Sequence, residues 1–253
     1  MTAPFEGRVA LVTGAGRGIG RAVALGLAAG GAQVALVARS LGQLEEAAEA
    51  VRARGDTAAV LQADVADPEA VAEVAARAAK ELWSVDILVN NAAVVQPVGP
   101  TVTASPTAWA SAFAVNVDAP FHLAQAVLPA MLDRRWGRIV NVSSGIAAHP
   151  GAMIGMNAYA ATKAALEAHT LNLAAELAGS GVTVNVYRPG SVDTAMQEWI
   201  RSQPPEEIGA ALHERFQVSY EQGSLMTPEH SARSLLARLV GDATGKIWTM
   251  TDA

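Results

Sequence analysis

The pair Tyr159 and Lys163 is the first candidate for chemistry in this sequence. Both residues lie in an Ala-rich stretch that predicts a helix over 157–178, and their i,i+4 spacing puts both side chains on one face. A nearby ammonium stabilises a phenolate, so we expect a lowered pKa for Tyr159. Such a tyrosine can serve as general acid or general base. Alone the pair is a weak signal, because an amphipathic helix can carry a tyrosine and a lysine by chance.

Two further segments place polar groups where ligands bind in parallel α/β sheets. Ser144 follows the apolar segment 138–142, which predicts a strand, and so lies at its carboxyl end. Glycines dominate residues 13–20, between a predicted strand over 8–12 and a predicted helix over 19–29. Glycine permits a tight turn and a close phosphate, while the helix offers free N–H groups and the positive end of its dipole. This turn predicts a dinucleotide site; a turn that binds nothing is the alternative.

The glycine turn reads Thr-Gly-Ala-Gly-Arg-Gly-Ile-Gly and matches in full the TGxxxGxG motif of the short-chain dehydrogenase/reductase family. The chain resembles this family over nearly its whole length, with its motifs in family order. Residues 90–93 are similar to the family's NNAG motif, and residues 189–194 to its PGxxxT stretch. The resemblance implies that the serine hydrogen-bonds the substrate carbonyl and that an asparagine supports a water-linked proton relay through the lysine. The implied catalytic tetrad is Asn116, Ser144, Tyr159 and Lys163.

The end of the predicted second strand bears on the choice of nicotinamide cofactor. A carboxylate there would bind the ribose 2′-hydroxyl and repel a 2′-phosphate, but residues 37–40 contain no acid and include Arg39. A guanidinium suits a phosphate, and in similar family members the residue at the position of Arg17 joins it. We therefore expect NADP(H); an ordinary solvated arginine is the alternative. The resemblance implies cofactor contacts from Gly14, Gly16, Arg17, Gly18, Ile19, Gly20, Arg39, Asp64, Val65, Asn91, Tyr159, Lys163, Pro189, Gly190, Val192 and Thr194.

Apolar residues near these motifs are the candidates for a substrate pocket. They predict a bulky or hydrophobic carbonyl compound; packing of a lid is the alternative. The expected pocket residues are Ser144, Val94, Met153, Ile154, Met196 and Trp199, with Val95 and Ile200 as further candidates.

Some features depart from the common family pattern. Ala93 stands in place of the last glycine of NNAG, the loop 149–157 is enlarged, and Arg188 precedes Pro189 where a small residue is commoner. Residues 193–197 and the TGKIW ending resemble the branch that contains sepiapterin and benzil reductases. In that branch a near-terminal aspartate can meet the substrate, and Asp252 lies at a comparable place. A solvated terminal carboxylate is the alternative for Asp252.

The elements that must position these residues alternate regularly between strand-like and helix-like segments. Strands are predicted over 8–12, 33–38, 57–62, 86–90, 138–142, 182–187 and 246–250, and helices over 19–29, 41–54, 68–82, 106–132, 157–178 and 228–240. Strands that are apolar on both faces, each followed by a helix, indicate a parallel sheet covered on both sides. The expected fold is an α/β, Rossmann-type doubly wound sheet of about seven strands in one domain, 1–253, with a mobile substrate-loop insertion at about 190–227.

Composition narrows the class of protein further. Apolar residues make up 51% of the chain, and the net charge of −6 disfavours a nucleic-acid partner. There is no cysteine, no apolar run long enough to span a membrane, no signal-peptide pattern and no metal-ligand spacing among the scattered histidines. We expect a cytoplasmic protein without a metal, whose long Ala-rich helices permit a homodimer or homotetramer.

Taken together, the motifs predict an NADP(H)-dependent oxidoreductase that interconverts a ketone and a secondary alcohol by hydride transfer, with a small carbonyl or alcohol compound as its substrate. Two alternatives stay open. One is a 3-oxoacyl-thioester reductase of the same family, and the other is a non-catalytic NADP-binding regulator. The sequence does not choose the physiological substrate, the stereochemistry or the direction of the reaction.

Overall fold

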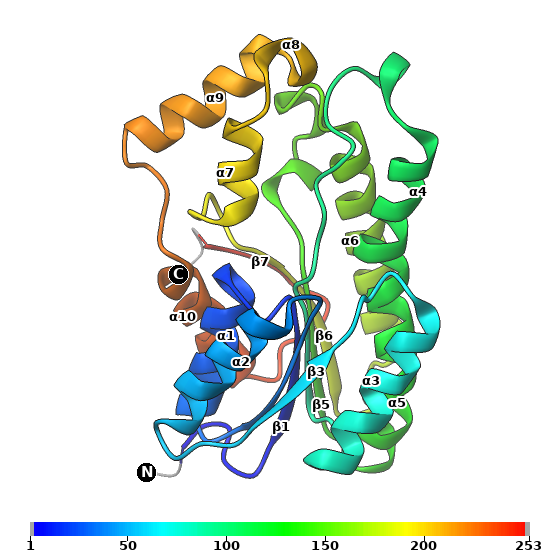
Figure 1. Cartoon of the computed structure of the whole chain (residues 1–253). Coiled ribbons are helices and arrows are strands. Elements are labelled where there is room, and N and C mark those ends of the chain that lie inside the picture. Colours follow the sequence, from blue (N-terminus) through cyan, green and yellow to red (C-terminus); the bar gives the residue numbers. More distant parts are fainter. Residues whose placement is uncertain (1–2, 251–253) are drawn as a thin grey trace.

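The computed structural model describes residues 3–250 and is built around one parallel sheet (Figure 1). Its strands are β1 (Val9–Thr13), β2 (Gln33–Ala38), β3 (Ala58–Gln62), β4 (Ile87–Asn90), β5 (Gly137–Val142), β6 (Val182–Arg188) and β7 (Ile247–Thr249). They are arranged in the order β3-β2-β1-β4-β5-β6-β7, and every neighbouring pair is parallel. The prediction of a doubly wound sheet of about seven strands is confirmed. The strand order reverses between β1 and β4, which is where such sheets bind ligands.

Helices cover both faces of the sheet because each strand is apolar on both of its faces. On β1, Ala10 and Val12 pack against one set of helices while Val9 and Leu11 pack against the other. The first set is α1 (Gly18–Ala29), α2 (Leu41–Arg52) and α10 (Pro228–Leu239); the second includes α3 (Pro68–Glu81), α5 (Ala119–Asp133) and α6 (Asn157–Glu176). Figure 1 shows α1, α2 and α10 on one side of the strands and α3, α5 and α6 on the other. These two layers fix the strand ends that carry the site.

The long helix predicted over 106–132 is present but contains a π-helical turn that the sequence does not predict. The structure has α4 (Pro106–Phe113), then a π-helical turn, η2 (Ala114–Asp118), and then α5. A π-turn adds a residue to the helix and is frequent at functional sites. Here it carries Asn116, whose side chain is fully buried. The apolar periodicity of the sequence does not reveal such an extra residue.

Short helices lie above the carboxyl ends of the strands. After β6 the chain forms α7 (Ala195–Arg201), α8 (Pro205–Ile208) and α9 (Ala210–Glu221), and single turns form at η1 (Thr101–Thr103), η3 (Gly145–Ala147) and η4 (Pro150–Ala152). These helices occupy the top of the view in Figure 1. A separate apolar cluster, which includes Ile200, Leu212, Phe216, Val95 and Ile146, packs them onto the loops after β4 and β5. This packing gives the substrate end of the site a wall of helices. The expected mobility of the segment stays a prediction.

Among the described residues 3–250, no helix is both long and apolar enough to cross a membrane. The same residues contain no group of three His, Cys, Asp or Glu side chains arranged to hold a metal ion.

Candidate active site

A cavity of about 830 Å³ lies at the carboxyl ends of the strands. One end of it is bounded by the glycine turn after β1. Gly14 has φ +65°, and a Cβ there would lie 2.7 Å from Asn91 Nδ2 and 3.1 Å from the Cα of Ala92. A side chain at this position would therefore be strained and would meet the backbone of the neighbouring strand end. Gly14, Gly16, Gly18 and Ile19 line the cavity, whereas Gly20 packs against Gly14 and Asn91.

The helix that follows this turn leaves its first N–H groups free of a side-chain cap. Arg17 occupies the N-cap position in an extended conformation and makes no capping hydrogen bond. A helix N-terminus reached through bare glycine backbone is suited to a diphosphate. The turn therefore fits the pyrophosphate of a dinucleotide.

Thr13 joins the glycine turn to the end of β4, a role that the sequence reasoning missed. Its hydroxyl oxygen accepts hydrogen bonds from the N–H groups of Asn91 and Ala92, both at 3.0 Å. Asn91 returns a hydrogen bond from Nδ2 to the Thr13 carbonyl at 2.9 Å. The sequence alone does not give the order of the strands. It therefore could not show that Thr13 lies next to Asn91 and Ala92.

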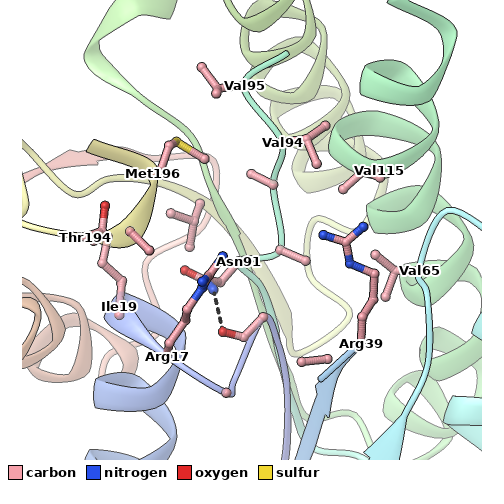
Figure 2. Close-up of a pocket in the computed structure, with 18 of the residues that line it drawn as sticks. Arg17, Ile19, Arg39, Val65, Asn91, Val94, Val95, Val115, Thr194 and Met196 are labelled. Carbon is pink, nitrogen blue, oxygen red and sulfur yellow. Dashed lines mark hydrogen bonds between the residues drawn. The ribbon is translucent and has the colours of Figure 1, made fainter. Parts of the chain in front are cut away.

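Two arginines face the cavity from different elements. Arg17 comes from the glycine turn and Arg39 follows β2, and Figure 2 shows both guanidinium groups directed into the cavity. Among residues 3–250, neither arginine takes part in an ion pair. Asp64 and Val65, which follow β3, also line the cavity. The two cations are thus free to meet an anion at this end.

Tyr159, Ser144 and Lys163 come together near the other end of the cavity. The hydroxyl of Ser144 lies close enough to the Tyr159 phenol to act on its pKa. Lys163 Nζ lies 5.6 Å from the centroid of the Tyr159 ring and donates a hydrogen bond to the Val142 carbonyl at 2.7 Å. Tyr159 and Lys163 line the cavity, whereas Ser144, the N-cap residue of η3, does not, so its place in the substrate pocket stays a prediction. The structure brings these side chains from β5 and α6 into one cluster.

Burial governs the proton affinity of this cluster. It raises the pKa of Tyr159 to about 12, and the hydrogen bond with Ser144 acts in the opposite direction. The prediction of a lowered tyrosine pKa is therefore wrong. Burial also lowers the pKa of Lys163 to about 8, against the effect of the Glu167 carboxylate. A phenol with a raised pKa stays protonated near neutral pH, which is the form a proton donor needs.

Asn116 does not line the cavity but fastens one of its walls. Its Oδ1 accepts from the N–H of Val94 at 2.9 Å, and its Nδ2 donates to the Val94 carbonyl at 2.8 Å and to Thr162 Oγ1 at 3.0 Å. Thr162 is the residue directly before Lys163. Asn116 therefore links the segment after β4 to the helix that carries the tyrosine and lysine. Its part in a proton relay stays a prediction.

The expected substrate pocket is partly corrected by the structure. Val94, Val95, Met196 and Trp199 line the cavity, and Figure 2 shows Val94, Val95 and Met196 at its upper part. Other expected residues do not line it. Ile154 is wrong as a pocket residue: its side chain is 85% exposed, because the loop after η4 turns it outward. Met153 and Ile200 do not line the cavity but pack in the same apolar cluster as Val95, Met196 and Trp199, so their contact with a substrate stays a prediction.

The stretch after β6 contributes to the cavity unevenly. Pro189 and Thr194 line it, whereas Val192 is buried and pairs with Met226 in an isolated bridge. Gly190 has φ +78° and packs against Met226 and Met250, so it does not line the cavity either. The expected cofactor contacts of Gly190 and Val192 stay predictions. Asp252 lies outside the described residues.

A buried ion pair that was not predicted lies one helical turn beyond Lys163. Arg188, at the end of β6, binds the carboxylate of Glu167 at 2.6 Å. The i,i+4 spacing of Lys163 and Glu167 was visible in the sequence, but the partner Arg188 depends on the order of the strands.

Comparison with known proteins agrees with this geometry. The family described as short chain dehydrogenase matches residues 8–205. The chain belongs to the short-chain dehydrogenase family. It is therefore an oxidoreductase of that family, and the resemblance drawn from its motifs is confirmed.

Two curated relatives and one solved structure show how the similarity extends. The chain is 37% identical over 241 residues to 2,3-dihydro-2,3-dihydroxybenzoate dehydrogenase of Bacillus subtilis, covering 94% of this chain and 91% of the relative. It is 40% identical over 192 residues to the 3-oxoacyl-[acyl-carrier-protein] reductase FabG of Pseudomonas aeruginosa, covering 76% of each. The structure of L-sorbose reductase from Gluconobacter frateurii with NADPH and L-sorbose has a TM-score of 0.87 at 28% identity, covering 98% of this chain and 97% of that chain. The similarity to sepiapterin and benzil reductases stays a prediction.

Proposed function

We propose that this short-chain dehydrogenase interconverts a ketone and a secondary alcohol with NADP(H), and that its substrate is largely apolar. The observation that carries the proposal is that Tyr159 and Lys163 line the same cavity that begins at the glycine turn, with Ser144 next to Tyr159. A dinucleotide bound at the glycine turn and the proton donor Tyr159 would therefore act on one substrate molecule in the same cavity.

The choice of NADP(H) is supported by the charges near β2. Solved structures similar to this chain hold NADPH in one case and NAD⁺ in another, so this chain's own residues must support the choice. Arg39 and Arg17 face the cavity, and no acid follows β2 before α2. A 2′-phosphate would meet a guanidinium where an NAD-specific site offers a carboxylate. Both arginines would also contact phosphate groups without first breaking an ion pair.

The residues of the cluster have distinct tasks in carbonyl reduction. A bound nicotinamide cofactor would supply the hydride. Tyr159, protonated at neutral pH, donates its phenolic proton to the carbonyl oxygen. Ser144 donates a hydrogen bond to the same oxygen and orients it. The Lys163 ammonium stabilises the phenolate that remains, since an opposite charge nearby favours the ionised form.

The lining of the cavity indicates the substrate class. Val94, Val95, Met196 and Trp199 line it on the side of the segments after β4 and β6, together with the polar residues Gln96, Glu198 and Ser202. The cations that line the cavity are Arg17, Arg39 and Lys163, and the first two lie at the phosphate end. A substrate carboxylate would therefore find no unused cation near the tyrosine. Uncharged ketones with apolar substituents fit this wall better than keto acids do.

The 3-oxoacyl-thioester reductase alternative is favoured by the similarity to FabG and disfavoured by the position of the basic residues. A carrier-protein substrate would need basic docking residues near the entrance of the site, and Arg134, Arg135 and Arg138 form a local basic cluster in the sequence. The structure places these residues around the start of β5, at the amino ends of the strands. They are thus at the end of the sheet opposite the cavity. Arg138 is in addition stacked on Trp136 and largely buried.

An NADPH-consumption screen tests the proposed function. The panel contains aryl and alkyl ketones, diketones, keto esters, keto acids, pterins and a 3-oxoacyl thioester, each with NADPH and with NADH. We expect turnover of apolar ketones with NADPH. Turnover of the thioester alone would favour the alternative enzyme. NADPH binding without oxidation across the panel would favour the non-catalytic regulator and contradict the proposal.

We also propose that the chain forms a homo-oligomer through α5 and α6. Both helices are long, and Phe121 and Leu171 on them are exposed large apolar side chains. Light scattering after gel filtration measures the state, with a dimer or tetramer expected and a monomer contradicting the idea. A cytoplasmic location stays an expectation from the composition.

A further inference from the structure

A buried polar network next to Lys163 has no role in the chemistry described so far. The carboxylate of Glu167, on α6, accepts a hydrogen bond from the hydroxyl of Ser143 at 2.7 Å. Arg188 at the end of β6 binds the same carboxylate through Nε at 2.8 Å and Nη2 at 2.6 Å. Glu167 is 7% exposed, and the Arg188 side chain is 17% exposed. We call Ser143, Glu167 and Arg188 the Glu167 network.

This network holds the backbone that the catalytic cluster uses. Ser143 stands between Val142, whose carbonyl accepts the hydrogen bond from Lys163 Nζ, and Ser144, whose hydroxyl reaches Tyr159. Fixing the Ser143 side chain therefore fixes the peptide groups on both sides of it. The planar fork between a guanidinium and a carboxylate has a defined geometry, which suits it to such a task.

The network also sets the charge around Lys163. Glu167 follows Lys163 by one helical turn on the same face of α6, and Arg188 approaches the carboxylate from β6. Tyr159 is the other titratable group of α6 that faces the lysine, and the β5 groups in contact with it are uncharged. One buried anion thus lies between two cations. Glu167 acts to raise the pKa of Lys163, in opposition to the effect of burial.

We propose that the Glu167 network positions the Lys163 ammonium and the Ser144 hydroxyl beside the Tyr159 phenol. The inference rests on the proposed function, in which these groups act together on a carbonyl oxygen. The three network residues are positioning residues, because they act through their neighbours. Arg188 is also followed directly by Pro189, which lines the cavity, so the network ties the wall of the site to the helix that carries the lysine.

The first test measures the ionisation of Lys163 directly, without any turnover. The chain has only three lysines, Lys80, Lys163 and Lys246, and Lys80 and Lys246 are exposed. Protein labelled with ¹³C at lysine Cε therefore gives three signals, which Lys80→Arg and Lys246→Arg assign. In Glu167→Gln the pKa of Lys163 should fall by about one unit relative to the unaltered protein, because an adjacent anion has been removed.

A matched control removes a similar carboxylate elsewhere. Glu81 forms an exposed i,i+4 ion pair with Arg77, and Glu81→Gln should leave the Lys163 titration unchanged. An unchanged Lys163 pKa in Glu167→Gln would overturn the inference, as would an equal shift in the control.

The second test separates positioning from folding. Glu167→Asp keeps the charge but shortens the arm, so it can no longer reach Ser143 and Arg188 together. Its Lys163 pKa should stay near that of the unaltered protein, while kcat for ketone reduction falls by about tenfold with KM unchanged, because the reacting groups are misplaced. An Asp variant with full kcat would contradict the inference. If the unaltered protein shows no turnover, the proposed function fails, but the lysine titration still decides whether the network governs Lys163.

Discussion

Replacing Arg39 by alanine tests the part of the site that is proposed to select the cofactor. Arg39 follows β2 and lines the cavity, and within residues 3–250 it forms no ion pair. Its side chain is exposed, so we expect the free energy of unfolding to change by less than about 0.5 kcal/mol. The substitution should therefore act on cofactor binding alone.

The expected magnitude follows from the loss of one charge-assisted contact. A hydrogen bond between charged groups contributes about 1.5–3 kcal/mol, and the exposure of Arg39 places it at the lower end, about 2 kcal/mol. That value corresponds to a roughly 30-fold rise in Kd for NADPH. NADH lacks the 2′-phosphate, so its Kd should stay within about twofold of that of the unaltered protein, since it loses no contact of this kind.

Fluorescence titration of both nucleotides measures these constants. Arg233→Ala is the control, because Arg233 is an exposed arginine on α10 that does not line the cavity. Equal weakening of NADPH and NADH in Arg39→Ala would refute the reasoning. So would a change in Kd for NADPH of less than about threefold, because it would leave no room for a charge-assisted contact.

Three other predictions concern the remaining parts of the site. Ketone reduction should slow as the pH rises through about 8, because the Lys163 ammonium that stabilises the Tyr159 phenolate is lost there. Alcohol oxidation should instead keep rising with pH above 8, because it needs the phenolate as base and the pKa of Tyr159 is raised to about 12. A pH–rate profile without this opposite trend would contradict both assignments. Gly14→Ala should lower the melting temperature and abolish NADPH binding, because Gly14 has φ +65° and an added Cβ would lie 2.7 Å from Asn91 Nδ2. Unchanged NADPH binding in a titration would show that the turn does not hold the nucleotide. Trp199→Ala should raise KM for bulky ketones but not Kd for NADPH, because Trp199 lines the cavity. Ile154→Ser should change neither constant, because Ile154 is 85% exposed. The reverse pattern in steady-state kinetics would exclude the proposed substrate wall.

Much of the fold could be read from the sequence because a parallel sheet repeats one simple pattern. The strand predicted over 33–38 coincides with β2, and the ends of the other strands differ by at most one residue. Asp67 caps α3 and Thr227 caps α10, each accepting a hydrogen bond from the first turn of its helix. Helix ends are encoded locally, by capping side chains and prolines, and so they are visible without knowledge of the tertiary structure.

What the sequence did not reveal depends on contacts between distant segments. The π-turn that buries Asn116 follows from its bonds to Val94 and Thr162 and leaves no mark in apolar periodicity. Arg188 stood out as unusual, yet its partner Glu167 is brought close only by the packing of α6 on β6. The direction of the Tyr159 pKa shift was wrong for the same reason, since burial cannot be judged from an i,i+4 spacing.

Single-turnover reduction of a ketone by Tyr159→Phe tests the central claim most directly. Phenylalanine keeps the ring but lacks the hydroxyl group, which carries the proton that is donated to the carbonyl oxygen. We expect the rate of NADPH oxidation to fall by about 10²–10⁴-fold while Kd for NADPH stays unchanged. A variant that oxidises NADPH as fast as the unaltered protein would show that Tyr159 is not the proton donor.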